Sequence, residues 1–110
     1  MLAKVPIKEF NKRVLLDHDY REHPDGSLWW AKKESIATQD FVFVVTMSPS
    51  VSYATIIVFD PNDPPSDLSD RGRIITVWLK DKLQEITNEV IKIESEMAYE
   101  NENNEVEHDE

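Results

Sequence analysis

The sequence predicts an α+β fold: an antiparallel meander of about four strands, then a long loop, then one long C-terminal helix. Three observations predict it. Runs of β-branched and aromatic residues, separated by turn residues, recur up to residue 60. Three prolines and three aspartates at 61–71 break regular structure. Beyond them, apolar residues recur at helical steps. A chain of this length is one domain, which we place at residues 1–99, with a tail at 100–110.

The segment before the first clear turn fits two structures, and residues 5–12 stay open between helix and strand. A short helix with Pro6 in its first turn would explain the spacing of Ile7, Phe10, Val14 and Leu15. Alternation of side chains from Val14 to Tyr20 has the period of a strand instead. We favour a strand at about residues 13–21, because a turn and a second strand follow it directly.

That turn is the tetrapeptide His23-Pro24-Asp25-Gly26, with Pro and Gly at the positions that a type I turn prefers. Residues 27–33 are then the returning strand of a hairpin. Successive side chains of a strand point to opposite faces, so Trp29 and Trp30 should lie on opposite sides of the sheet.

Two further strands are predicted at residues 40–48 and 51–60. The first is almost wholly apolar, which is typical of a central strand. Pro49-Ser50 separates the two strands, and so short a connection makes them antiparallel.

The long helix is expected at about residues 72–98, with Ser69 or Asp70 as its N-cap. Its apolar residues form one heptad seam: Leu79, Leu83, Ile86, Val90, Ile93 and Met97. We expect the first half of the helix to pack on the sheet. The second half should extend past it and mediate self-association through Leu83, Ile86, Val90, Ile93 and Met97. The alternative is that the whole seam lies on the chain's own sheet.

Charge is unevenly distributed along the chain. The net charge is −10, and residues 94–110 hold eight acids and no Lys or Arg, whereas the rest carries 14 acids and 12 bases. A near-neutral body argues against a mimic of duplex DNA and against direct nucleic-acid binding. The tail at 100–110 should be disordered. We see neither a signal peptide nor a membrane-spanning segment, so we expect a cytoplasmic protein.

Few residues suggest catalysis or metal binding. The absence of Cys excludes disulfides, thiolate metal sites and a Cys nucleophile. Glycine occurs only at 26 and 72, so no glycine-rich phosphate loop exists. His18 and His23, with Asp17 and Asp19, match no standard metal spacing. We therefore expect no catalytic residues, no metal and no cofactor, and we keep a small enzyme as a minor alternative.

One group of residues suggests ligand binding. A helix N-terminus attracts anions, and Arg71, Gly72 and Arg73 lie where the long helix should begin. Aromatic side chains that could stack on a base are Trp29, Trp30, Tyr53 and Trp78. The alternative is structural: both arginines pair with Asp67 and Asp70, and the tryptophans belong to the core.

In outline the chain resembles small phage-encoded anti-defence proteins, which are short, cysteine-free and acidic, with an antiparallel sheet and one long helix. The resemblance implies either an oligomeric sponge that sequesters a nucleotide signal or an inhibitor of a host nuclease, in the host cytoplasm. We expect a non-catalytic homo-oligomer that binds a phosphate-bearing, nucleotide-like molecule. The alternative is an inhibitor or adaptor that binds a host protein through Trp29 or Trp30 and the acidic tail.

Overall fold

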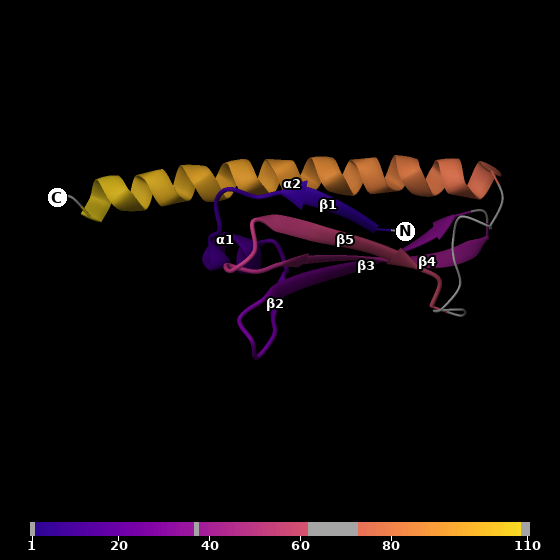
Figure 1. Cartoon of the computed structure of the whole chain (residues 1–110), viewed down its shortest axis with the longest axis horizontal. Coiled ribbons are helices and arrows are strands. Elements are labelled where there is room, and N and C mark those ends of the chain that lie inside the picture. The colour runs from indigo at the N-terminus through magenta and orange to yellow at the C-terminus, as the bar shows by residue number, and fades with distance from the viewer. Residues whose placement is uncertain (1, 37, 62–72, 109–110) are drawn as a thin grey trace.

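The computed structural model describes residues 2–36, 38–61 and 73–108 and shows an antiparallel five-stranded sheet with one long helix along it (Figure 1). The elements, in order, are β1 (Leu2–Pro6), α1 (Lys12–Asp17), β2 (Arg21–Glu22), β3 (Leu28–Ile36), β4 (Gln39–Met47), β5 (Tyr53–Phe59) and α2 (Arg73–His108). This is the α+β class that the sequence predicts. The predicted loop falls almost entirely outside the described residues.

The sheet has the strand order β1-β5-β4-β3-β2. Strands β2 to β5 form the predicted meander, and β4 lies at its centre, as its apolar sequence indicates. Strand β1 was not predicted. It pairs with the outer edge of β5, with Leu2 opposite Ile57 and Pro6 opposite Tyr53. Pro6 is tolerated in this edge strand because proline lacks only the backbone N–H group, and an edge strand does not use every N–H group for pairing.

The prediction of a strand at residues 13–21 was wrong. Residues 12–17 form the short helix α1, and only Arg21–Glu22 are in a strand. The Asn11 side chain caps α1 by accepting from the backbone amides of Arg13 and Val14. Burial of Val14 and Leu15 then anchors the helix to the core. The cap and these two side chains outweigh the alternating pattern.

The turn between β2 and β3 is as predicted. The Gly26 amide donates to the His23 carbonyl at 3.0 Å, and the His23 amide donates to the Ser27 carbonyl at 2.8 Å. Gly26 has φ +91°, a conformation that favours glycine. The Asp25 carboxylate accepts from both the amide and the hydroxyl of Ser27. The turn therefore fixes how β2 and β3 align.

Helix α2 is longer than predicted, because it begins at Arg73 and continues to His108 instead of ending near residue 98. Residues 100–108 thus continue the helix where the sequence predicted a disordered tail. At about 1.5 Å per residue its 36 residues span roughly 54 Å, close to the 57 Å length of the molecule. Its C-terminal end extends past the sheet and α1 (Figure 1).

The heptad seam of α2 is buried against the chain itself. Ile86, Val90, Ile93 and Met97 belong to the core, and Leu83 packs against it. The sheet and the N-terminal segment that includes α1 together cover a longer part of α2 than a four-stranded sheet would cover alone. The expected intersubunit interface through these residues is therefore corrected: the seam holds α2 on its own domain.

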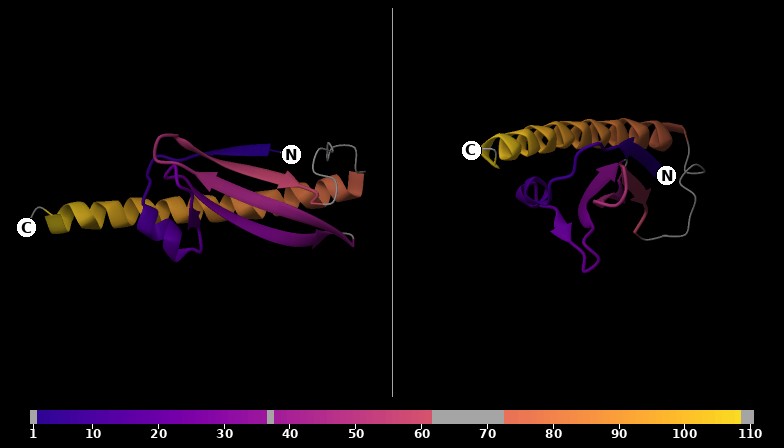
Figure 2. Two further views of the ribbon diagram at one scale, coloured as in Figure 1. Left: turned by 90° about the horizontal axis from the view of Figure 1, so that it is seen from below. Right: turned by 60° about the vertical axis from the view of Figure 1, so that its left-hand side comes forward.

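The two faces of the sheet differ in cover. One face packs under α2 with Leu28, Phe41, Phe43, Val45, Met47, Ile56 and Val58 in the core. No described helix covers the other side, which lies in front of α2 when the molecule is seen from below (Figure 2, left). We call this side the open face. Alternation along the strands places Trp29, Val42, Val44 and Ile57 on it.

Candidate functional site

Of the residues that the sequence suggested for ligand binding, the described aromatic side chains do not form a single cluster. Arg71 and Gly72 lie outside the described residues, and Arg73 is placed only as the first residue of α2. Trp30 faces the core, where it stacks on Tyr20 with ring centroids 6.4 Å apart. Trp78 lies on α2 and is 46% exposed.

Trp29 and Tyr53 share the open face, on strands separated by β4. The prediction that Trp29 and Trp30 point to opposite sides is confirmed. Two aromatic side chains of the predicted site therefore share one surface, Trp29 beside Arg21 and Tyr53 beside Lys4.

On the open face, two side chains contact Trp29 and form a cluster with it. The guanidinium of Arg21 lies 5.7 Å from the centre of the indole, and the His23 ring stacks on the indole with a centroid distance of 5.8 Å. All three side chains follow from the hairpin. Arg21 is directly opposite Trp29 in the register, and His23 lies two residues further along the chain, on the same side. We call these three residues the Trp29 cluster.

A hollow of about 380 Å³ adjoins the cluster, lined by Asp19, Arg21, Trp29, Trp30 and Ala31. Two local features create it. Asp19 has φ +68°, and the chain before Arg21 is not paired with β3. Ala31 follows Trp29 on the same face and fills little space. A planar group that enters the hollow would therefore contact aromatic surface.

The sequence analysis did not identify Arg21 and His23 as site residues. A signal for them existed, because the predicted turn at 23–26 fixes the hairpin register and hence what lies opposite Trp29. The prediction treated residues 13–21 as a strand and His23 as a turn residue. It did not take into account which residues pair across the hairpin.

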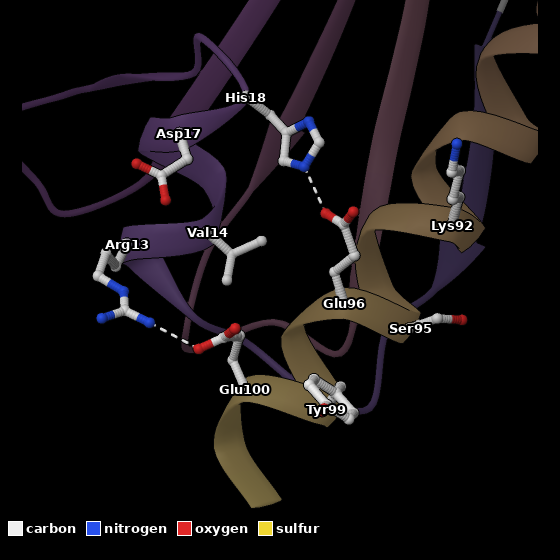
Figure 3. Close-up of a pocket in the computed structure, with 9 residues that line it drawn as sticks. All are labelled: Arg13, Val14, Asp17, His18, Lys92, Ser95, Glu96, Tyr99 and Glu100. Carbon is white, nitrogen blue, oxygen red and sulfur yellow. Dashed lines mark hydrogen bonds and ion pairs between the residues drawn. The ribbon is translucent and has the colours of Figure 1, made fainter. Parts of the chain in front are cut away.

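A second, larger hollow of about 540 Å³ lies between α1 and α2 (Figure 3). Two contacts cross it: an ion pair between Arg13 and Glu100 at 2.6 Å, and a hydrogen bond between His18 and Glu96. Asp17 and Lys92 also line it, with Val14 and Tyr99 as its main apolar surfaces. The groove thus mixes both signs of charge, and carboxylates already engage two of its three basic groups.

The polar contacts around this groove attach the N-terminal segment to α2. The Asn11 amide group donates to Asn101 at 3.0 Å, Asn101 donates to Glu9 at 2.9 Å, and the Lys8 backbone amide donates to Glu94. An anion entering the groove would have to displace carboxylates from Arg13 or His18. We therefore assign the groove to the attachment of α1, and the Trp29 cluster is the better candidate site for a phosphate-bearing ligand.

Two features are absent from the described part of the chain. Its His, Asp and Glu side chains form no group of three or more that could hold a metal ion. None of its helices combines the length and apolar character needed to cross a membrane. Comparison with protein-family models, with curated proteins and with solved structures gives no match for this chain.

Proposed function

We propose that the chain is a non-catalytic binding protein that holds a nucleotide-like ligand at the Trp29 cluster. One observation carries the proposal: a guanidinium and an imidazole lie against the same half-buried indole, beside a hollow on an uncovered sheet face. Hollows of this size accommodate small molecules. Sites for such ligands typically combine aromatic surface with a small number of polar groups.

Each part of a nucleotide has a counterpart in the Trp29 cluster or in the hollow beside it. An aromatic base would stack on the indole of Trp29. Arg21 offers a planar fork of donors that suits phosphate, and His23 adds a further donor. The Asp19 carboxylate accepts hydrogen bonds and suits ribose hydroxyls. Sequestration of such a ligand is what the resemblance to small anti-defence proteins leads us to expect, at a different site.

The test is a titration of the purified protein with linear and cyclic nucleotides, followed by calorimetry and by tryptophan fluorescence. Wild type should bind at least one of them, and affinity should fall as salt concentration rises. Trp29→Leu and Arg21→Gln should each weaken binding, the latter by roughly 1.5–3 kcal/mol for a charge-assisted hydrogen bond.

Matched controls are available elsewhere on the chain. Trp78→Leu removes an exposed tryptophan from α2, and Arg13→Gln removes an arginine that pairs with Glu100. Both should retain wild-type affinity. Absence of binding across the nucleotide panel, or loss of binding in the control variants alone, would refute the proposal.

A second candidate function is inhibition of a basic host protein, such as a nuclease. Helix α2 supports it, because Glu89, Glu94, Glu96, Glu100 and Glu102 lie within 14 residues that contain one base, Lys92. A partner rich in Lys and Arg would be attracted to this part of the helix. This candidate predicts that neutralising Glu96 and Glu102 weakens the complex, whereas Trp29→Leu does not.

A further inference from the structure

The middle of the open face is apolar and uncharged. The strand register places Leu2, Ile57, Val44 and Ala31 in one row across four strands. Val42 and Phe59 extend this apolar surface on one side, and Thr46 and Thr55 border it on the other. Leu2 is 59% and Ile57 39% exposed, so the row is in contact with water in the single chain.

Charged side chains lie only around the border of this surface. Lys4 lies over the Tyr53 ring at 4.6 Å, Arg21 lies beside Trp29, and Lys33 pairs with Asp40 at 3.3 Å. An apolar centre with a polar border is the usual anatomy of a protein–protein interface. A single-stranded nucleic acid is less suitable, because it requires stacking rings along its path, whereas the row across the middle of this face is aliphatic and the aromatic side chains lie outside the row.

We propose that the open face binds a second copy of this chain, sheet against sheet. Flat sheet faces with β-branched residues pack well on one another, about 10 Å apart, as in β-sandwiches. A twofold axis through the apolar row would bring the same residues of both copies together.

Charge favours this arrangement over any other contact between two copies. The chain carries a net charge of −10, whereas the described charged residues on or beside the open face nearly balance, with three bases, Lys4, Arg21 and Lys33, and two acids, Asp40 and Asp19. Contact through the open faces leaves both α2 helices, with their glutamates, on the outside and far apart. Contact through α2 would bring like charges together, which opposes association.

The available area agrees with a weak, concentration-dependent dimer. Strands about 4.8 Å apart and seven residues of about 3.3 Å each give the four long strands a projected face of roughly 450 Å². Two such faces cover about 900 Å², near the lower limit of roughly 1,000 Å² for a specific interface. We therefore expect dissociation in the micromolar range or weaker.

The experiment is analytical ultracentrifugation from about 10 μM to about 1 mM, a range suited to such affinities, without added nucleotide. Wild type should shift from the 12.8 kDa monomer to twice that mass. Ile57→Lys should stay monomeric. Ile91→Lys is the matched control, because Ile91 is also an exposed isoleucine (49%, against 39% for Ile57) and lies on the outside of α2, so this variant should dimerise like wild type.

Cross-linking gives an independent result if Ile57→Lys does not fold. The chain has no cysteine, so Val44→Cys introduces a unique thiol in the apolar row. A short bis-maleimide should join two Val44→Cys chains and should not join two Ile91→Cys chains. A wild type that is monomeric at every concentration, or equal dimerisation and cross-linking of both sets of variants, would overturn the proposal. Nucleotide binding at the Trp29 cluster is measured separately and survives either result.

Discussion

Tyr20 is the buried ionisable residue whose environment changes its pKa most clearly. It lies in the core, stacked on Trp30. Burial raises the pKa of its hydroxyl far above the ordinary value of 10.0, and the negative charge of Glu89 adds to the effect. The folded chain therefore holds this proton more tightly than the unfolded chain does.

The consequence is a loss of stability in alkaline solution. Below pH 10 both states keep the proton, and the contribution of Tyr20 is complete. Above about pH 10 only the unfolded state loses the proton, so the free energy of unfolding falls by up to about 1.4 kcal/mol per pH unit. Tyr20→Phe should flatten this decline in urea titrations between about pH 9 and pH 11.

Tyr53→Phe is the control, and it should keep the wild-type slope because Tyr20 is still in place. An unchanged slope in Tyr20→Phe would show that other groups cause the alkaline loss. Thermal stability at neutral pH should be measured for both variants, so that a packing defect is not mistaken for a titration effect.

At the scale of elements, the seam of α2 contributes to the domain's own stability. Val90 is 1% exposed, whereas its neighbour Ile91 is 49% exposed on the same turn of the helix. Val90→Asp would bury an unpaired carboxylate, which costs about 3–5 kcal/mol, a large part of the roughly 5–15 kcal/mol that stabilises a typical domain. Ile91→Asp should cost less than about 1 kcal/mol.

Circular dichroism during thermal unfolding separates the two explanations of the seam. We expect Val90→Asp to unfold at a much lower temperature, or to be unfolded at once, and Ile91→Asp to behave like wild type. A folded, stable Val90→Asp monomer would instead restore the seam as an interface between subunits.

The sequence predicted the elements with strong periodic signals and missed those that depend on tertiary contacts. Strands β3, β4 and β5 and helix α2 all have apolar patterns long enough to define them. Strand β1 has five residues, and its pairing with β5 depends on a partner more than 40 residues away. Helix α1 has six residues. In the sequence, the Asn11 cap that favours this helix is no stronger a signal than the alternating pattern that favours a strand.

The candidate site was predicted only in part, for a similar reason. Trp29 was identified because consecutive tryptophans on a strand cannot both face one core. Its partners Arg21 and His23 come from the other strand of the hairpin, and only the register shows that they meet. The predicted anion site at Arg71 and Gly72 lies outside the described residues, so it stays a prediction.

At the scale of the whole molecule, one face of the sheet packs in the core, and no described helix covers the other face. Helix α2 runs along one face of the sheet, and its C-terminal end extends past the sheet (Figure 2). The open face holds the Trp29 cluster at one border and the apolar row in its middle. Our central claim is that binding takes place on the open face.

The three tryptophans allow one measurement to test this claim, because each reports on a different part of the molecule. Trp29 lies on the open face, Trp30 faces the core, and Trp78 is an exposed residue of α2 near the end of β3. Nuclear magnetic resonance of the ¹⁵N-labelled protein resolves one indole N–H signal for each, assigned with Trp→Phe variants. When the nucleotide panel is added, we predict that the Trp29 signal shifts most, that the Trp30 signal shifts less because Trp30 lines the same hollow, and that the Trp78 signal stays in place. A shift of Trp78 with Trp29 unmoved, or no shift of any indole up to saturating nucleotide, would contradict the claim.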